Sequence, residues 1–212
     1  LGAVCAITAT SLPMTSIQAL AAGEKDAKAT KEDGLILHYD FESLKTGTIV
    51  EDLSGNGKAG VIRPTGSQVT TEDVNIYGAD QTAYKFLGGQ PSNTNTYVEL
   101  PVGVFNDLED MTVSCWVNMK EAWGSYQRIW DFGFKNDKGQ FNTTTYMYLL
   151  ADGSNEGHKG YTAALTNSGW GDEKGPEKGT ALATDEWIFT TVTFDGSEKE
   201  MSLYEDGVLI GT

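Results

Sequence analysis

The sequence has 212 residues, and its 15 Lys and Arg stand against 30 Asp and Glu, which gives a formal net charge of -15. This balance argues against a nucleic-acid partner, because phosphate backbones are bound by basic side chains, and it disfavours adhesion to anionic lipid. With 39% hydrophobic and 10% aromatic residues, the chain is too apolar to be disordered. The length fits one large domain or two small ones.

The first 22 residues are apolar and carry no charge, but Thr, Ser and Pro13 interrupt them. A membrane-spanning helix needs about 20 nearly continuous apolar residues, so residues 1–22 predict no membrane insertion. The stretch closes in Ala19-Leu20-Ala21, which is typical of the apolar and cleavage regions of a secretory signal. Because the positive start of such a signal is missing, we interpret residues 1–22 as a truncated secretory signal peptide. A buried helix is the alternative interpretation.

Residues 23–33 (GEKDAKATKED) predict a charged, exposed leader. Cys5 would leave with the signal, so Cys115 would stay alone in the mature protein, and a lone cysteine does not demand oxidising conditions for folding. These features predict a secreted or cell-surface protein, of bacterial type rather than a disulfide-rich animal domain.

From Gly34 onward, short apolar or alternating runs recur and predict β-strands. They are residues 35–41, 97–100, 111–117, 146–150, 187–194, 201–204 and 208–210. Asp195-Gly196 and Asp206-Gly207 predict the turns that join the last three strands. Trp116 breaks the polar face of its strand, so protein or ligand must cover that face. No sustained helical period and no Pro-rich linker appear, and residues 34–212 therefore predict a single all-β sandwich.

The sequence ends at Gly211-Thr212, directly after the second strand of a predicted hairpin. A sandwich of this type usually pairs its terminal strand near its first strand. We therefore expect that the sandwich lacks its last strand and that the chain is a C-terminally truncated fragment of a longer protein.

Four stretches resemble a known family. They are residues 37–42 (LHYDFE), 50–60 (VEDLSGNGKAG), 111–117 (MTVSCWV) and 187–207, which includes Trp187 and the LYEDG hairpin. In order and spacing they are similar to laminin-G-like jelly-roll domains of the concanavalin A-like lectin/glucanase superfamily. The resemblance covers about residues 34–212. It implies a two-sheet antiparallel jelly roll, of a kind that commonly sits beside glycoside hydrolase domains in exported bacterial proteins and binds glycans or bridges domains.

Catalytic patterns are absent from the sequence. Glycoside hydrolysis needs two carboxylates flanking the bond, and glucanases of this superfamily place them on one strand as E-x-D-x-E, a spacing that does not occur here. The acid pairs Glu198/Glu200, Glu205/Asp206 and Asp185/Glu186 lie at predicted turns and strand ends, where solvated side chains are the simpler interpretation. We expect no catalytic residue in this segment, and we expect the hydrolase activity of a parent protein to lie outside it.

Calcium is the most plausible metal for this sequence. It takes six to eight oxygen ligands, and Asp52 and Asn56 lie in one compact turn with several carbonyl groups, while Asp40 could approach from the first strand. The alternative is that Asp52 and Asn56 only fix the turn through hydrogen bonds from side chain to backbone. Both interpretations of Asp52 and Asn56 stay open, whereas the alternative is favoured for Asp40.

Loop aromatics are the candidate carbohydrate-binding residues, since sugar CH faces stack on Trp and Tyr and hydroxyls bond to polar groups. Trp123, Tyr126 and Arg128 fall in one polar stretch, and Trp170 and Asp172 fall in a Gly-flanked one. Trp123 and Tyr126 could equally pack beneath the following strand. For Trp170, a ligand or an interface is the favoured interpretation.

Together these features predict an exported, non-catalytic module that binds a poly- or oligosaccharide or docks against a neighbouring catalytic domain of the same chain. Two alternative functions remain open. One is a glycoside hydrolase of lectin-like fold with an unfamiliar arrangement of acids, and the other is an adhesion module that recognises protein.

Overall fold

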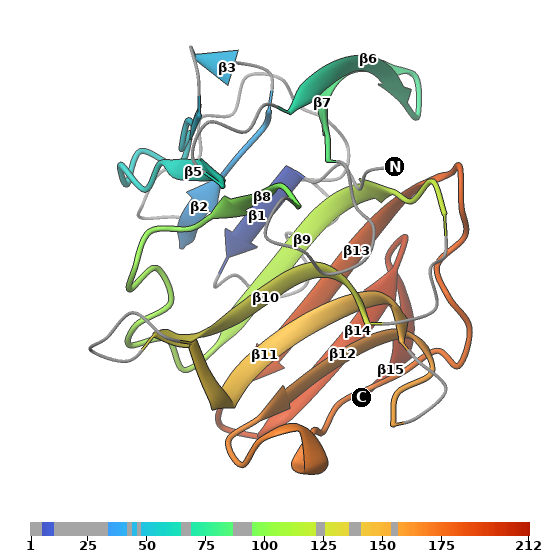
Figure 1. The fold of residues 1–212 in the computed structure, drawn as a ribbon. Coiled ribbons are helices and arrows are strands. Elements are labelled where there is room, and N and C mark those ends of the chain that lie inside the picture. The colour runs from blue at the N-terminus through green and yellow to red at the C-terminus, as the bar shows by residue number, and fades with distance from the viewer. Residues whose placement is uncertain are drawn as a thin grey trace.

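The computed structural model describes residues 6–10, 34–41, 44–45, 48–64, 69–86, 95–121, 126–135, 141–153 and 157–212. Two layers of β-strands face each other (Figure 1), and every ladder between named strands is antiparallel. The helical element in this part of the chain is a single 3-10 turn, η3 (Trp170–Asp172). The predicted all-β sandwich is therefore confirmed.

The first layer is a six-stranded sheet with the order β15-β14-β13-β9-β1-β2. Its strands are β1 (Ala6–Thr10), β2 (Leu35–His38), β9 (Met111–Asn118), β13 (Trp187–Asp195), β14 (Glu200–Glu205) and β15 (Val208–Gly211). β14 and β15 meet at Asp206 and Gly207, whose φ angles of 49° and 78° suit a two-residue hairpin turn. This turn confirms the sequence-based prediction.

The second layer is a three-stranded sheet with the order β10-β11-β12. It consists of β10 (Gln127–Lys135), β11 (Phe141–Gly153) and β12 (Gly160–Thr166). Two small sheets complete the described fold. One contains β3 (Leu44–Lys45), β4 (Ile49–Val50), β5 (Gly60–Arg63) and β8 (Tyr97–Glu99), and the other is the hairpin of β6 (Thr70–Ile76) and β7 (Ala79–Lys85).

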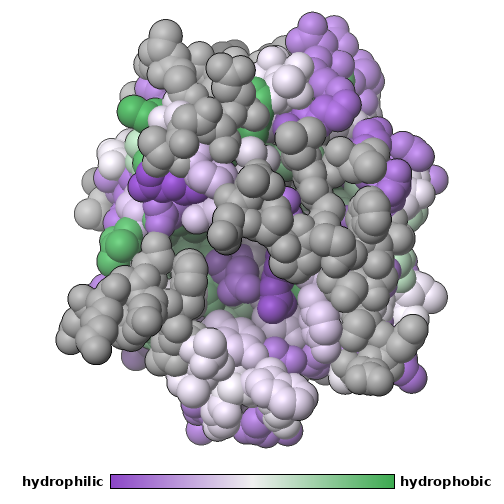
Figure 2. Space-filling view, in the orientation of Figure 1, coloured by the Kyte–Doolittle hydropathy of each residue, from purple (hydrophilic) through white to green (hydrophobic). Residues whose placement is uncertain are grey.

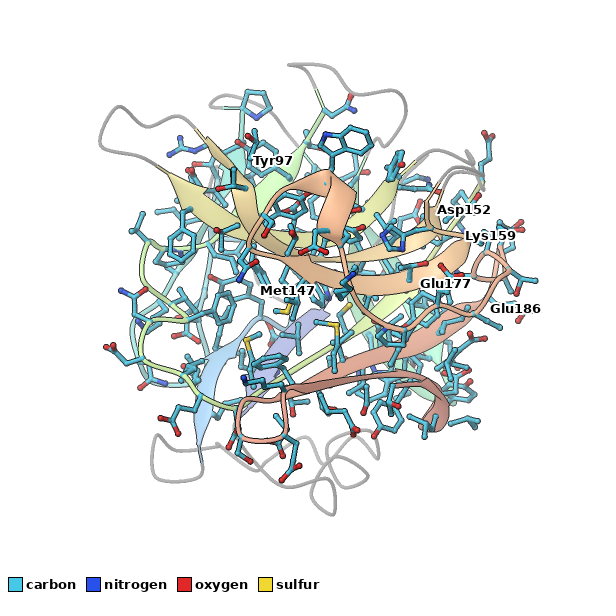
Figure 3. All side chains as sticks on the ribbon, turned by 90° about the horizontal axis from the view of Figure 1, so that it is seen from below. Tyr97, Met147, Asp152, Lys159, Glu177 and Glu186 are labelled. Atoms are coloured by element: carbon cyan, nitrogen blue, oxygen red, sulfur yellow. The ribbon has the colours of Figure 1, made fainter. Side chains whose placement is uncertain are left out.

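The main core lies between the two layers. Alternate residues of β9, namely Val113, Cys115 and Val117, are buried there, which confirms the predicted apolar face. Leu149 of β11 meets them from the other layer, and the labelled Met147 points into the same space (Figure 3). Because strand side chains alternate between faces, the neighbours of Met147 and Leu149 in β11 must point away from this core.

The opposite face of β9 is also covered, as Trp116 predicts. The Trp116 ring lies 5.0 Å from that of Phe189 on β13 and 5.4 Å from that of Tyr77, centre to centre. Tyr77 sits at the tip of the β6–β7 hairpin with a φ of 48°. Protein therefore covers Trp116, which leaves no need for a ligand at that position.

Ala6–Thr10, within the predicted signal peptide, forms strand β1 between β2 and β9. The alternative of a buried helix is therefore wrong for these five residues. The leader at 23–33 lies outside the described residues, and the secretory signal stays a prediction. Among the described residues, no helix is long and apolar enough to cross a membrane.

Candidate functional site

The candidate site is the face of β10–β12 that is turned away from the six-stranded sheet, called here the outer face. Paired residues on neighbouring strands point to the same face of the sheet, so strand pairing shows which residues lie on the outer face. Arg128 lies opposite Leu150, Asp131 opposite Tyr148, and Tyr146 opposite Thr166. In the view of Figure 1 this sheet is nearest the reader, and Figure 2 shows a hydrophilic area over it. The outer face therefore combines aromatic rings with charged groups.

An arginine covers the central tyrosine of this face. The guanidinium carbon of Arg128 lies 3.9 Å from the centre of the Tyr148 ring, and Arg128 Nε lies 3.0 Å from Asp131 Oδ2. The Tyr146 ring stacks beside Tyr148 at 6.0 Å and 21°. Arg128 and Asp131 side chains keep 36% and 45% of their surface exposed, so a ligand would meet these two groups first.

Two glutamates enter the site from residues 173–180, the edge segment, which runs along the free edge of β12. Leu165 and Lys174 exchange two backbone hydrogen bonds of 2.9 Å, and Lys178 N donates to Tyr161 O at 2.8 Å. Gly175 is required here, because a Cβ at this position would overlap the carbonyl oxygen of Ala163. The segment thus acts as an additional edge strand and brings Glu173 and Glu177 beside the sheet.

Glu173 and His158 form the buried centre of the polar cluster. Tyr146 Oη donates to Glu173 Oε1 at 2.7 Å, and Glu173 Oε2 lies 3.1 Å from His158 Nε2. On its other side, His158 Nδ1 lies 3.7 Å from Glu177 Oε2. The ring of His158 also meets that of Tyr148 edge-on at 6.1 Å. These contacts hold both ring nitrogens of His158 against carboxylates.

Burial and neighbouring charges shift several pKa values at this face. Burial raises the pKa of Asp131, and the Glu173 carboxylate adds to the increase while Arg128 opposes it. Burial, with the hydrogen bond to Glu173, raises the pKa of Tyr146 to about 12. Burial likewise raises the pKa of Tyr148 far above its usual value. Both tyrosines therefore stay neutral hydrogen-bonding groups at physiological pH.

The Tyr148 hydroxyl differs from that of Tyr146. It is buried, and it makes no hydrogen bond of ordinary length in the part of the chain that the structure describes, although Glu173 and Arg128 lie near enough to influence its pKa. Buried polar groups are nearly always paired with protein or ordered water. A hydroxyl-rich ligand or a water molecule at this face would supply the missing partner.

The predicted carbohydrate-binding residues fall into two groups. Arg128 belongs to the cluster, and Tyr126 is 42% exposed just before β10, with its hydroxyl beside Gly157. Trp170, 85% exposed, and Asp172, paired with Lys174 at 3.1 Å, lie on η3, which Figure 3 shows on the outer side of the sheet. Trp123 lies outside the described residues.

The two groups are at opposite ends of β11. Gln127, next to Tyr126, pairs with Asp152, whereas Gly169, next to Trp170, donates its N–H to Thr144 O. Asp152 lies eight residue steps beyond Thr144 along the strand, or about 26 Å at 3.3 Å per residue. The structure therefore does not bring Trp170 and Tyr126 together, but it places the polar cluster between them.

Sequence reasoning missed most of the cluster, namely Asp131, Tyr146, Tyr148, His158, Glu173 and Glu177. Tyr146 and Tyr148 carried a usable signal, because both fall on one face of a predicted strand whose other face is apolar. His158, Glu173 and Glu177 lie in Gly-rich or Pro-containing connections, where no periodicity reveals which way a side chain points.

The predicted calcium turn is held by hydrogen bonds. Asp52 Oδ1 accepts from the N–H groups of His38 and Ser54, both at 3.0 Å, and Oδ2 accepts from Ser54 Oγ and Lys58 N, both at 2.8 Å. A carboxylate offers about four acceptor sites, so these four donors occupy Asp52. As arranged, the carboxylate does not fit a cation.

The other two predicted ligands are placed around the same turn. Asn56 Nδ2 donates to the carbonyl oxygens of Leu35 and Ile36 at 2.9 and 3.1 Å. Asp40 follows β2, and its charge, with that of Asp52, partly offsets the burial that lowers the pKa of His38. Among the described residues, no three His, Cys, Asp or Glu side chains converge as metal ligands would. Calcium binding is therefore untested, and these contacts favour the alternative in which Asp52 and Asn56 fix the turn through hydrogen bonds.

A laminin G family model, described as the concanavalin A-like lectin/glucanases superfamily, matches residues 92–212. The match covers more than half of the chain and includes β8 to β15 with the whole polar cluster. No curated protein and no solved structure matches the chain.

Proposed function

The chain belongs to the concanavalin A-like lectin/glucanase superfamily, and from this premise we propose that it is an exported, non-catalytic module that binds carbohydrate on the outer face of β10–β12. The observation that carries the proposal is the cluster of Arg128, Asp131, Tyr146 and Glu173 on the face turned away from the sandwich core. Sugar hydroxyls are recognised by few, well-placed polar groups next to aromatic surfaces. The cluster supplies both.

The charge of the site indicates the class of glycan. Asp131, Glu173 and Glu177 gather around one arginine and one histidine, in a chain whose formal net charge is -15. A uronate or sulfate group would meet repulsion there, because like charges at short range cost free energy. The ligand we propose is therefore a neutral glycan.

The position of the exposed aromatic rings indicates the length of the ligand. Trp170 and Tyr126 flank the polar cluster at the two ends of β11. An oligosaccharide that lies along β11 would stack on a ring at each end and bond to Arg128 and Asp131 between them. A monosaccharide could contact only part of this surface.

Glycan-array binding by the full chain tests the proposal, with neutral oligosaccharides beside uronate-containing ones of matched length. Retention of neutral oligosaccharides, lost in Arg128→Ala, is the expected result. Retention of no glycan, or of acidic glycans alone, would contradict it. If the chain binds a protein and no glycan, the result would support the alternative function, a protein-binding adhesion or domain-docking module.

A second candidate function, glycoside hydrolysis, is favoured by one observation. Burial raises the pKa of Asp131, while Arg128 opposes the increase and the Glu173 carboxylate adds to it. Glycosidases use a carboxyl with a raised pKa together with a second carboxylate. Release of reducing sugar by the full chain, abolished by both Asp131→Asn and Glu173→Gln, would establish this function. Binding without release would leave the module non-catalytic.

A further inference from the structure

An uncharged segment near the N-terminus occupies an interior position of the main sheet. β1 pairs with β9 along five residues and with β2 on its other side, so it separates two strands that do not pair with each other. The same residues belong to the stretch whose composition predicts a secretory signal. Removal of that stretch would open the sheet between β2 and β9.

The neighbours of this position are core residues. In the register of the sheet, Ile7 is the partner of Cys115, and Ala9 is the partner of both Val113 and Leu37. Leu37, Val113 and Cys115 are each at most 1% exposed. An occupant of this position must therefore be uncharged at the places of Ile7 and Ala9, and β1, with the sequence AITAT, meets that requirement.

We propose that the position between β2 and β9 is a strand-binding site. It holds residues 6–10 in the uncleaved chain, and after removal of residues 1–22 it takes a different antiparallel strand, five residues long and made of small and β-branched uncharged residues. The second half of this inference rests on the proposed export. Carbohydrate binding by the outer face does not depend on it.

The vacated position could not stay empty at low cost. Both β2 and β9 would present rows of unpaired backbone groups, which recruit another strand, and buried N–H and C=O groups without partners are strongly disfavoured. An incoming strand would satisfy both edges at once. This is the mode of peptide recognition in which an extended segment is added to a sheet.

A disulfide trap tests the place of β1 in the full chain. Cα atoms of directly opposed residues in an antiparallel pair lie about 4.5–5.5 Å apart, within the range that a disulfide bridges. In a Cys5→Ser background, Ile7→Cys should oxidise with the native Cys115, whereas the control Thr8→Cys, whose partner on β9 is Ser114, should not. Equal or absent crosslinking in both variants would overturn the assignment of β1. Ala9→Cys with Val113→Cys gives a second trap if Ile7→Cys does not fold.

Strand exchange is tested on a chain that has already folded. A site-specific protease sequence replaces residues 24–31 of the full chain, and the protein is cut after folding. A labelled peptide with the sequence of residues 6–12 is then added, beside a control peptide carrying Ile7→Pro and Ala9→Pro, because proline cannot donate to the ladder. The proposal predicts release of the native segment and incorporation of the first peptide only.

The outcomes separate this inference from the proposed function. Retention of the cut segment against excess peptide would show that β1 is a permanent strand. Release of the segment in the absence of peptide, without loss of thermal stability, would show that it is no part of the sheet. Either result overturns the inference while glycan binding persists. Loss of glycan binding with normal strand exchange would contradict the proposed function instead.

Discussion

The guanidinium group of Arg128 lies over the ring of Tyr148, with 3.9 Å between its central carbon and the ring centre. The contact closes an aromatic surface that a sugar would otherwise use, and it holds the guanidinium in place for hydrogen bonding. A cation–π contact of this kind contributes about 0.5–2 kcal/mol, more as it is desolvated. Arg128 is therefore the residue whose loss most directly tests the binding face.

Arg128→Ala should weaken binding of a neutral oligosaccharide by about tenfold or more, because charge-assisted hydrogen bonds contribute about 1.5–3 kcal/mol. The matched control is Arg63→Ala. Arg63 pairs with Glu99 on the β5–β8 ladder and is 35% exposed, against 36% for Arg128. Isothermal titration calorimetry should show normal affinity for the control, and equal losses in both variants would remove Arg128 from the site.

Trp170→Ala should lower the affinity by roughly 3- to 10-fold without a change in thermal stability, because aromatic stacking contributes about 0.5–1.5 kcal/mol and Trp170 is already 85% exposed. Trp170→Phe keeps a ring and should retain most of the affinity. If Trp170→Ala binds like the unmodified chain, the ligand does not reach η3.

Tyr146→Phe and Tyr148→Phe form a matched pair on neighbouring positions of one strand face. Tyr146→Phe deprives Glu173, whose side chain is 10% exposed, of a 2.7 Å donor and should cost about 1–3 kcal/mol of unfolding free energy. Tyr148→Phe removes a buried hydroxyl that makes no hydrogen bond of ordinary length among the described residues, although Glu173 and Arg128 lie near it, so it should cost less than Tyr146→Phe. Urea denaturation measures both, and a larger loss for Tyr148→Phe would show that its hydroxyl is satisfied in solution.

Asp52→Asn should destabilise the fold in a pH-dependent way. Burial acts to raise the pKa of Asp52, but hydrogen bonds from Lys58, His38 and Ser54 outweigh it, and the net pKa is lowered. A carboxyl with a lowered folded-state pKa stabilises above its unfolded value of about 3.9 and loses this contribution as the pH falls through the folded value. The loss in Asp52→Asn should thus be large near neutrality, about 1–3 kcal/mol, and should shrink below about pH 4.

The hydrogen bonds of the Asp52 turn also predict how the protein responds to calcium. Because four donors occupy the Asp52 carboxylate, we expect that EDTA and added calcium leave the melting temperature of the unmodified chain unchanged. A fall with EDTA that calcium reverses would show that a cation displaces these donors. Magnesium at equal concentration is the control for ionic strength.

The sandwich itself could be predicted from the sequence, because its strands carry local signals. Val113, Cys115 and Val117 alternate with polar residues, and Asp206-Gly207 marks a hairpin turn. β6 (TTEDVNI) and β12 (GYTAALT) were missed. β6 is mostly exposed and polar, and β12 is buried on both faces, so neither shows the expected alternation of polar and apolar residues.

The site could not be predicted to the same extent. In β10 an irregular register between Arg128 and Trp130 interrupts the alternation, so Arg128 and Asp131 share a face although they are three residues apart. Glu173 and Glu177 reach the site through backbone pairing of their segment with β12, which leaves no pattern in the side chains. Long-range pairing of this kind is set by tertiary structure.

In the edge segment next to β12, the exposed side chains that could contact a ligand differ from the backbone atoms that attach the segment to the sheet. Main-chain hydrogen bonds hold it to the sheet, and the side chains of Glu173 and Lys178 add contacts to Tyr146 and Glu205. Most of its side chains could therefore be exchanged while the scaffold stays intact. A library randomised at Glu177, whose side chain is 41% exposed, would offer a short route to new sugar preferences on an unaltered sandwich.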